Sequence, residues 1–235
     1  MAPPTNTIPV LDFASPQGNL SPAQWLEVAN RGVRGIWAKC GNGNNAPDPT
    51  FRGNVAGARG AGLAVGTYAV PFVLPLDETS HPGRSPLDQA QAHFQQSGAL
   101  GLVLGDLPPM VDLEWPEPKD WAHWGVTPSF ARAFSLLYLG ETRRLIGRRP
   151  LLYLYSDWEM HLFQGATADE LDAFKEYPLW IARYGVTYPG TLPPWDAPTL
   201  WQKSGGGGVL PNGRTVDEDV FLGDADAWEA FRQSA

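Results

Sequence analysis

Two acidic residues separated by one apolar residue are the first candidates for chemistry in this sequence. Asp112 and Glu114 flank Leu113 at the end of an apolar segment, and strand alternation places both carboxyls on one face. The two-residue strand repeat separates them by about 7 Å, a distance at which they repel each other. Partial burial under Trp115 would raise one pKa, which keeps a carboxylic acid protonated near neutral pH. The alternatives are a solvated strand end and a salt-bridged pair.

Two further acids strengthen the case for an acidic site. Asp12 and Asp217 each end or lie in a predicted strand, and neither has an obvious basic neighbour in the sequence. We expect these two carboxyls to converge with those of Asp112 and Glu114. A cluster of acids in a cleft is either a cation site or a glycosidase-like site.

Other catalytic chemistries find little support in the sequence. The single cysteine, Cys40, excludes an intramolecular disulfide and a cysteine-based zinc cluster, and it lacks a nucleophile signature. No G-x-S-x-G segment occurs. Neither H-x-H nor H-E-x-x-H spacing is found among the four histidines, which are His81, His93, His123 and His161. We therefore expect no metal and no cofactor.

Composition and charge narrow the class of protein further. The 235 residues carry a formal charge of −8, which disfavours nucleic acid or an anionic membrane as the main partner. Apolar residues make up 43% and charged residues 18%, so a large core is expected and intrinsic disorder is not. A chain of this length suits one α/β barrel domain. The sequence shows no secretory signal and no membrane span, so we expect synthesis in the cytosol.

The acidic residues must be positioned by strands, and the sequence alternates strand-like and helix-like segments. Five helices are predicted at 22–31, from 48 to 60 or 62, 85–98, 128–147 and 167–174. Eight strands are predicted at 8–11, 33–39, 63–68, 110–115, 151–155, 179–183, 198–203 and 215–221. We interpret the glycine run at 205–208 as a mobile loop.

This order of elements predicts an α/β fold with five βα units first and three helix-poor strands last. Alternation favours a parallel sheet, and eight strands favour its closure into a barrel. A doubly wound open sheet is the alternative, but it requires a phosphate-binding glycine fingerprint that residues 16–19 lack. In a barrel the active site lies at the C-terminal ends of the strands, which is where the acidic residues are.

Several segments, in order and at fixed spacing, match one family pattern. They are LDFASPQG at 11–18, VRGIWAKCGNG at 33–43, AGARGAGL at 56–63, VGTY at 65–68, LPPMVDLE at 107–114, LWIARYG at 179–185, LWQ at 200–202 and VD at 216–217. Nearly end to end, the chain resembles glycoside hydrolase family 25, the N-acetylmuramidases or lysozymes of bacteria, fungi and phages. The resemblance implies a modified TIM-like barrel of eight strands and about five main helices, forming a single catalytic domain over residues 1–235 without a separate wall-binding domain.

The resemblance also implies an activity and a role for each acid. The reaction is cleavage, with retention, of the β-1,4 bond between N-acetylmuramic acid and N-acetylglucosamine. Glu114 would be the general acid, and Asp112 would hold or charge-stabilise the substrate's own N-acetyl group as it attacks the anomeric carbon. Asp12 and Asp217 would line the same subsite. Substrate contacts are also expected at Tyr68, Tyr153, Trp180, Tyr184, Trp201 and Gln202, with core packing as the alternative for the aromatic residues.

The chain departs from the family pattern at three positions near the expected site. Asn42 replaces a glutamate, Ala69 stands where histidine is common, and Asp219 takes the place of the usual asparagine. None of these changes touches Asp112 or Glu114. We hypothesise that the extra carboxyl of Asp219 raises the pKa of neighbouring acids.

The expected partner is therefore bacterial peptidoglycan, and we expect a monomer that binds neither nucleic acid nor membrane. Synthesis without a signal peptide is typical of a phage endolysin that reaches the wall after release, or of a toxin or virion component. A charge of −8 opposes binding to a thick teichoic-acid coat. Two alternatives stay open: a non-catalytic glycan-binding or virion structural protein, and a chitinase-type N-acetylhexosamine hydrolase.

Overall fold

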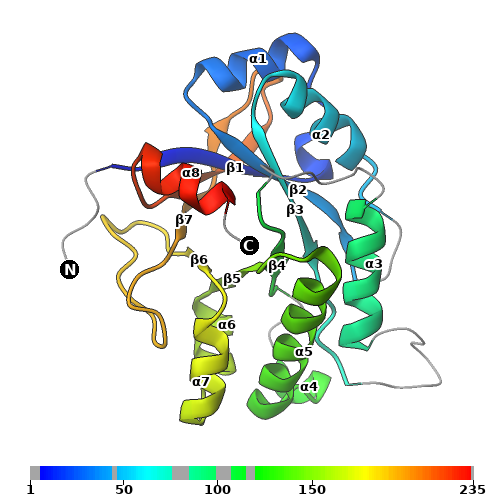
Figure 1. The fold of residues 1–235 in the computed structure, drawn as a ribbon, viewed down its shortest axis with the longest axis vertical. Helices are drawn as coiled ribbons and strands as arrows, with labels where there is room; N and C mark the ends of the chain where they lie inside the picture. The colour runs from blue at the N-terminus through cyan, green and yellow to red at the C-terminus, as the bar shows by residue number, and fades with distance from the viewer. Residues whose placement is uncertain (1–5, 44–46, 76–84, 99–106, 115–119, 234–235) are drawn as a thin grey trace.

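The protein folds as a closed barrel of eight strands, each beside its neighbour in sequence, with β8 next to β1 (Figure 1). The computed structural model describes residues 6–43, 47–75, 85–98, 107–114 and 120–233. Trp115 and His81 lie outside these residues. The strands are β1 (Ile8–Phe13), β2 (Gly35–Asn42), β3 (Ala64–Val70), β4 (Met110–Asp112), β5 (Leu151–Tyr155), β6 (Leu179–Ala182), β7 (Leu200–Val209) and β8 (Thr215–Phe221). The predicted α/β barrel is confirmed.

The last strand corrects the prediction of a parallel sheet. Strands β1 to β7 pair in parallel, whereas β8 runs antiparallel to both β7 and β1. Only residues 210–214 join β7 to β8. A connection this short closes a hairpin, because a parallel crossover needs a dozen or more residues. The absence of a helix between these two predicted strands was the sequence signal for this reversal.

The glycine run is part of a strand, contrary to the predicted mobile loop. Strand β7 continues through it, and Gly208 pairs with Val216 of β8. The pairing register shifts on both sides of Ser204. Gly206 has a φ of 73°, a left-handed backbone conformation that side chains rarely adopt. The run therefore forms an irregular stretch of the β7–β8 hairpin.

The five predicted helices are present, and four of them begin at the expected Ser or Thr capping residues; α2 instead begins at Phe51, after the predicted start at Asp48. At α1 the Ser21 hydroxyl accepts from the Gln24 backbone N–H while the Gln24 side chain accepts from the Ser21 N–H. The Thr127 hydroxyl accepts from a backbone N–H at the start of α5, and Gly147 ends this helix in the left-handed conformation. The five helices are α1 (Pro22–Asn30), α2 (Phe51–Gly60), α3 (Pro86–Gly98), α5 (Pro128–Ile146) and α7 (Ala168–Lys175).

Three α-helices were not predicted from the sequence. Two are short and follow the strands that carry the site: α4 (Trp121–Trp124) and α6 (Ser156–Leu162). The third, α8 (Ala225–Gln233), follows the last strand and crosses the end of the barrel at which β1 begins (Figure 1). A 3₁₀-helix (Ser15–Gln17) also follows β1. The two short helices, α4 and α6, carry too little periodicity to be recognised in a sequence.

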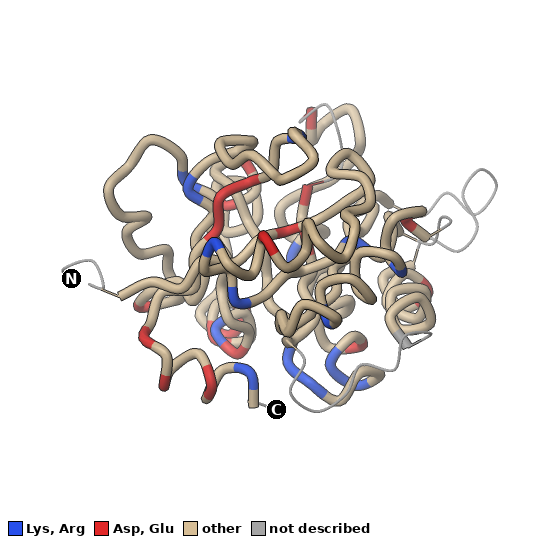
Figure 2. Tube along the Cα trace, turned by 90° about the horizontal axis from the view of Figure 1, so that it is seen from above, with Lys and Arg blue, Asp and Glu red and all other residues tan. Residues whose placement is uncertain are grey.

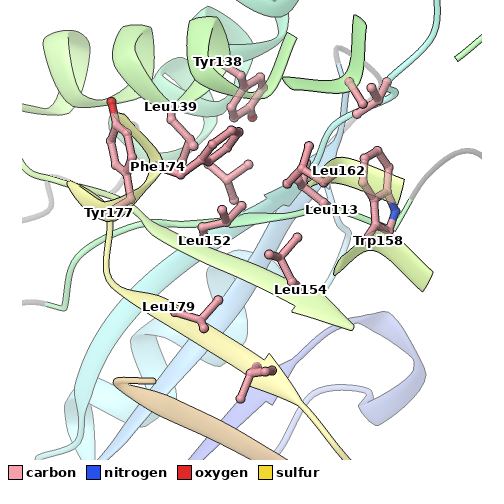
Figure 3. Close-up of a cluster of buried hydrophobic side chains, with 14 of the residues drawn as sticks. Leu113, Tyr138, Leu139, Leu152, Leu154, Trp158, Leu162, Phe174, Tyr177 and Leu179 are labelled. Atoms are coloured by element: carbon pink, nitrogen blue, oxygen red, sulfur yellow. The ribbon is translucent and has the colours of Figure 1, made fainter. Parts of the chain in front are cut away.

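Buried apolar side chains form one cluster inside the barrel and two outside it. The inner cluster includes Trp37, Tyr153 and Trp180. One outer cluster packs α1 and α2 against the sheet, and the other packs α5 and α7 against β4, β5 and β6. Figure 3 shows this last cluster, with Leu113 among its members. Side chains of one strand thus alternate between the barrel interior and the helical layer.

Acidic and basic residues are both spread over the fold. In Figure 2 acidic and basic positions are scattered along the trace, and several acidic positions lie near the centre of the view. Among the described helices, none combines the length and the apolar character needed to cross a membrane.

Candidate active site

The D-x-E segment places its two acids in the barrel mouth. Strand β4 ends at Asp112, before the predicted end, but the Leu113 N–H still donates to the Tyr153 carbonyl at 3.3 Å. Leu113 is fully buried in the outer cluster. Asp112 and Glu114 instead line one cavity of about 180 Å³. The strand alternation expected from the sequence is therefore present in the structure.

This cavity, the smaller of two at the barrel mouth, brings the four predicted acids together. Its lining includes Asp12 from the end of β1, Asp112 and Glu114 from the end of β4, and Asp217 from β8. Asp112 is 6% exposed, so it lies at the floor of the mouth. The remaining lining is Ala14, Pro16, Gln17, Tyr68, Met110, Tyr153 and Gln202.

A larger cavity of about 630 Å³ adjoins the smaller one. Glu114 and Tyr153 line both cavities, so the Glu114 carboxyl lies where the two meet. An ion pair of 2.8 Å between Arg183 and Glu159 fixes one basic side chain at this wall. The other lining residues are Tyr155, Ser156, Ala182, Tyr184 and Val186.

The side-chain amide of Gln202 connects the acids to the tyrosines. Its Nε2 donates to Asp12 at 2.9 Å and to Asp217 at 3.1 Å. Its Oε1 accepts from the hydroxyls of Tyr153 at 2.9 Å and Tyr184 at 2.5 Å. Both N–H donors and both acceptor positions of the amide are therefore used, which fixes its orientation. Gln202 is 3% exposed, so this network forms a rigid wall of the mouth.

The glycine run also contributes to the site. The backbone N–H of Gly206 donates to the Asp217 carboxylate at 2.6 Å. A Cβ at Gly205 would lie 3.3 Å from the Tyr184 hydroxyl oxygen. The backbone at Gly205 therefore approaches Tyr184 closely because this position lacks a side chain, whereas Gly206 suits its position through its left-handed φ of 73°.

Burial and mutual repulsion shift the titration of the mouth acids. Burial, followed by the carboxylate of Asp217, raises the pKa of Asp12 from 3.8 to about 7. The pKa of Asp217 is raised by burial, against the effect of the Gly206 N–H. Burial, and next the charge of Asp12, raises the pKa of Tyr68 well above its usual value. The mouth therefore holds a proton-sharing group of acids near neutral pH.

The hypothesis about Asp219 needs a correction. Asp219 does not raise the pKa of Asp12; its hydrogen bond to Asp12 lowers that pKa. The pKa of Asp219 itself is raised well above its usual value, first by burial and then by the charges of Asp12 and Asp217.

Two predicted substrate contacts lie away from both cavities. Trp180 is fully buried in the inner cluster, edge-on to Trp37 at 4.9 Å and to Tyr153 at 6.3 Å between ring centroids. Trp201 is 8% exposed and packs in an outer cluster, where its indole N–H donates to the Arg183 carbonyl. Core packing, the alternative considered for these residues, describes both positions.

Tyr155 and Arg183 are two of the lining residues that the sequence analysis missed. They lie at the C-terminal ends of β5 and β6. The rule that barrel sites gather at strand ends applies to both and would have found them. Among the described residues, no group of three or more His, Cys, Asp or Glu is arranged to hold a metal ion.

A barrel whose mouth combines converging carboxyls, tyrosines and an elongated cavity has the features of a glycoside hydrolase. Residues 11–209 match the family described as glycosyl hydrolases family 25. This match covers most of the chain, which therefore belongs to that family. It is a glycoside hydrolase of the lysozyme class, as the sequence motifs imply.

Individual relatives agree with this assignment. Lysozyme M1 of Streptomyces globisporus is 25% identical over 224 residues, which span 94% of this chain and 70% of that protein. The lysozyme structure from Streptomyces coelicolor superposes with a TM-score of 0.79 at 23% identity, covering 97% of this chain and 98% of that one. A family GH25 lysozyme structure from Aspergillus fumigatus gives 0.78 at 23% identity, covering 98% and 100%. Both structures share the barrel fold.

Proposed function

We propose that this protein cleaves the β-1,4 bond between N-acetylmuramic acid and N-acetylglucosamine in bacterial peptidoglycan. Residues 1–235 would act as one catalytic domain on the wall. The observation that carries the proposal is the position of Glu114 at the junction of two cavities. A general acid must reach the oxygen between two sugars, and this junction is where such an oxygen would lie.

In the proposed reaction Glu114 protonates the leaving oxygen as the glycosidic bond breaks. Asp112, almost buried at the floor of the smaller cavity, holds and charge-stabilises the substrate N-acetyl group while its carbonyl oxygen attacks the anomeric carbon. Water then opens the cyclic intermediate, with Glu114 taking back a proton, and the configuration is retained. This route needs no covalent bond to the enzyme.

The remaining side chains of the mouth are proposed to bind sugar. Asp12 and Asp217 line the smaller cavity, where their carboxyls accept from sugar hydroxyl or amide groups. Tyr68 borders the same cavity, whereas Tyr184 is 54% exposed at the larger one. Tyrosine rings present apolar faces to sugar rings and hydroxyls to their edges. The two cavities would therefore hold the sugars on either side of the scissile bond.

The bond specificity is tested by digesting purified peptidoglycan, reducing the new ends with borohydride and identifying them by mass spectrometry. Reduced muramic acid ends are the expected result. Reduced glucosamine ends would show cleavage of the other bond, and cleavage of a glucosamine-only polymer would favour a chitinase-type enzyme. No cleavage of any of these substrates would favour a glycan-binding protein and contradict the proposal.

A further inference from the structure

Asp219 is a buried acid immediately below the mouth. In the barrel register it pairs with Gln202 of β7 and with Val10 of β1. It is 3% exposed, and it lies two residues beyond Asp217 along β8, on the same inward face. Asp217, by contrast, lines the smaller cavity. The β8 strand therefore carries one acid into the site and a second acid into the layer beneath it.

The surroundings of Asp219 are acidic. The titratable groups that face it are Asp12 from β1, Asp217 from its own strand and Tyr184 from the segment after β6. In the described part of the chain Asp219 forms no ion pair, and neither of its carboxyl oxygens has a donor in good hydrogen-bonding geometry. The backbone N–H of Asp12 lowers the pKa of Asp219, but by less than burial or either neighbouring charge raises it.

An ionised carboxylate in this position would be desolvated and uncompensated, which is costly in free energy. A protonated carboxyl instead has one O–H to donate. The register places Asp12 two residues along β1 from Val10, the partner of Asp219, and on the same face, so its carboxyl is the neighbouring acceptor. Asp12 is only partly buried and already accepts from Gln202. The proton shared by this pair therefore resides on Asp219, and the charge resides on Asp12.

We infer that Asp219 is a positioning residue for the site: a permanently neutral carboxylic acid that donates its proton to the Asp12 carboxylate from below. Together with the Gln202 amide it holds Asp12 from two directions. The consequence for catalysis rests on the proposed function, because it assumes that Asp12 contacts the substrate. In this role an amide N–H at position 219 would replace the acid, whereas an apolar side chain would not.

Carboxyl ¹³C NMR tests the protonation state without any substrate. The protein would be labelled at its aspartate side-chain carboxyls, and the resonances assigned with Asp12→Asn and Asp219→Asn. We expect the Asp219 resonance to stay at its protonated position throughout the pH range in which Asp12 titrates. An Asp219 resonance that ionises before that of Asp12 would overturn the inference.

Substitutions test the donor role. Asp219→Asn keeps a donor, so the Asp12 pKa and the pH profile of kcat/KM should stay close to wild type. Asp219→Leu removes it, so the Asp12 pKa and the corresponding limb of the profile should move upward by about one to two units. Glu218→Gln, an exposed change on the same strand, is the control and should leave both unchanged.

Equal effects of Asn and Leu at position 219 would contradict the donor role. If Asp219→Leu does not fold, the wild-type spectrum and the Asp12 titration in Asp219→Asn still decide the question. If wild type cleaves no substrate, the proposed function fails, and the NMR titration alone decides whether Asp219 is a neutral donor.

Discussion

At the scale of single residues, one amide organises the barrel mouth. Gln202 donates to two acids and accepts from two tyrosines, so its removal would leave several buried polar groups without a partner. Neither the D-x-E spacing nor the family pattern indicates such a connection. The connection arises because closure of the barrel brings residues of β1, β5 and β8, which are distant in the sequence, to Gln202 of β7.

We predict that Gln202→Leu lowers kcat/KM by at least about tenfold, since each lost hydrogen bond to a charged group is worth about 1.5–3 kcal/mol. It should also raise the pKa of Asp12, because the Gln202 hydrogen bond lowers that pKa. The pH dependence of kcat/KM measures both effects. Lys203→Leu, a change of the next residue on β7, is the control. A Gln202→Leu profile identical to wild type would show that the network has no part in catalysis.

The sequence predicts which residues face the barrel interior but not how deep they lie. Tyr153 and Trp180 pair in register and both point inward, yet only Tyr153 lines the cavities. The depth of a side chain along the barrel axis depends on the register between strands, which a single sequence does not encode. The four acids were predictable because they end strands or lie on an inward face.

At the scale of elements, α8 closes the barrel end opposite the site. Trp228 and Phe231 pack against Phe221, each with 5.3 Å between ring centroids. A Cβ on Gly35, at the start of β2, would lie only 3.0 Å from the Trp228 ring, so this position must stay small. Phe221 pairs with Ile8 at the beginning of β1, whereas Asp12 lies near its end.

We predict that Trp228→Ala lowers the free energy of unfolding by about 3–5 kcal/mol, the usual cost of removing a large buried aromatic side chain. The activity per folded molecule should persist, because the site lies at the other end of the barrel. Urea denaturation measures the first quantity and initial rates of wall digestion the second. The exposed Glu229→Ala on the same helix should change stability little. A stable but inactive Trp228→Ala would contradict this separation.

A second feature at this scale is a buried histidine of α3 that faces β3 and α5. His93 lies 3.3 Å from the Thr67 hydroxyl and 3.3 Å from the Tyr138 hydroxyl. It is fully buried, and burial lowers its pKa from 6.5 to about 4. As the pH falls, this histidine is therefore protonated at a higher pH in the unfolded chain than in the folded protein. Its contribution to stability is complete above pH 6.5 and is lost as the pH falls towards 4.

We predict that replacing this residue, in His93→Gln, reduces the loss of stability on acidification by about 3 kcal/mol between pH 6.5 and 4. Urea denaturation at a series of pH values measures this loss. His123→Gln, which changes an exposed histidine, is the control. Identical slopes for wild type and His93→Gln would show that His93 does not resist protonation in the folded state.

Element types were largely predictable, and the exceptions have physical causes. Four of the five main helices (α1, α3, α5 and α7) begin at Ser or Thr caps that are visible in the sequence, whereas α2 has no such cap. The antiparallel direction of β8 follows from the short connection at 210–214, because five residues are too few for a parallel crossover. The glycine run is held as strand by pairing with β8 and by the Asp217 carboxylate, and both partners lie later in the sequence. Local composition alone therefore predicted a loop.

At the scale of the whole molecule, the residues that stabilise the barrel and the acids of the site occupy different regions. Aromatic and aliphatic clusters fill the interior and the helical layer, while the acids gather at one mouth, where burial raises the pKa of Asp12 and Asp217. The raised pKa of Asp12 costs stability as the pH rises from 3.8 to about 7, and it supplies a proton-holding group near neutral pH. The central claim is that Glu114 uses this setting to protonate the leaving oxygen.

The most direct test of that claim compares the cleavage rates of the Glu114→Gln variant on substrates with different leaving groups. A general acid matters for a sugar leaving group and hardly for a nitrophenolate, which leaves without a proton. We predict that Glu114→Gln loses peptidoglycan cleavage by roughly 10²–10⁴-fold but retains most of the first-turnover rate of nitrophenolate release from a peptidoglycan-derived oligosaccharide with a nitrophenyl leaving group. Equal loss on both substrates, or unchanged cleavage of peptidoglycan, would contradict the assignment of Glu114 as the acid.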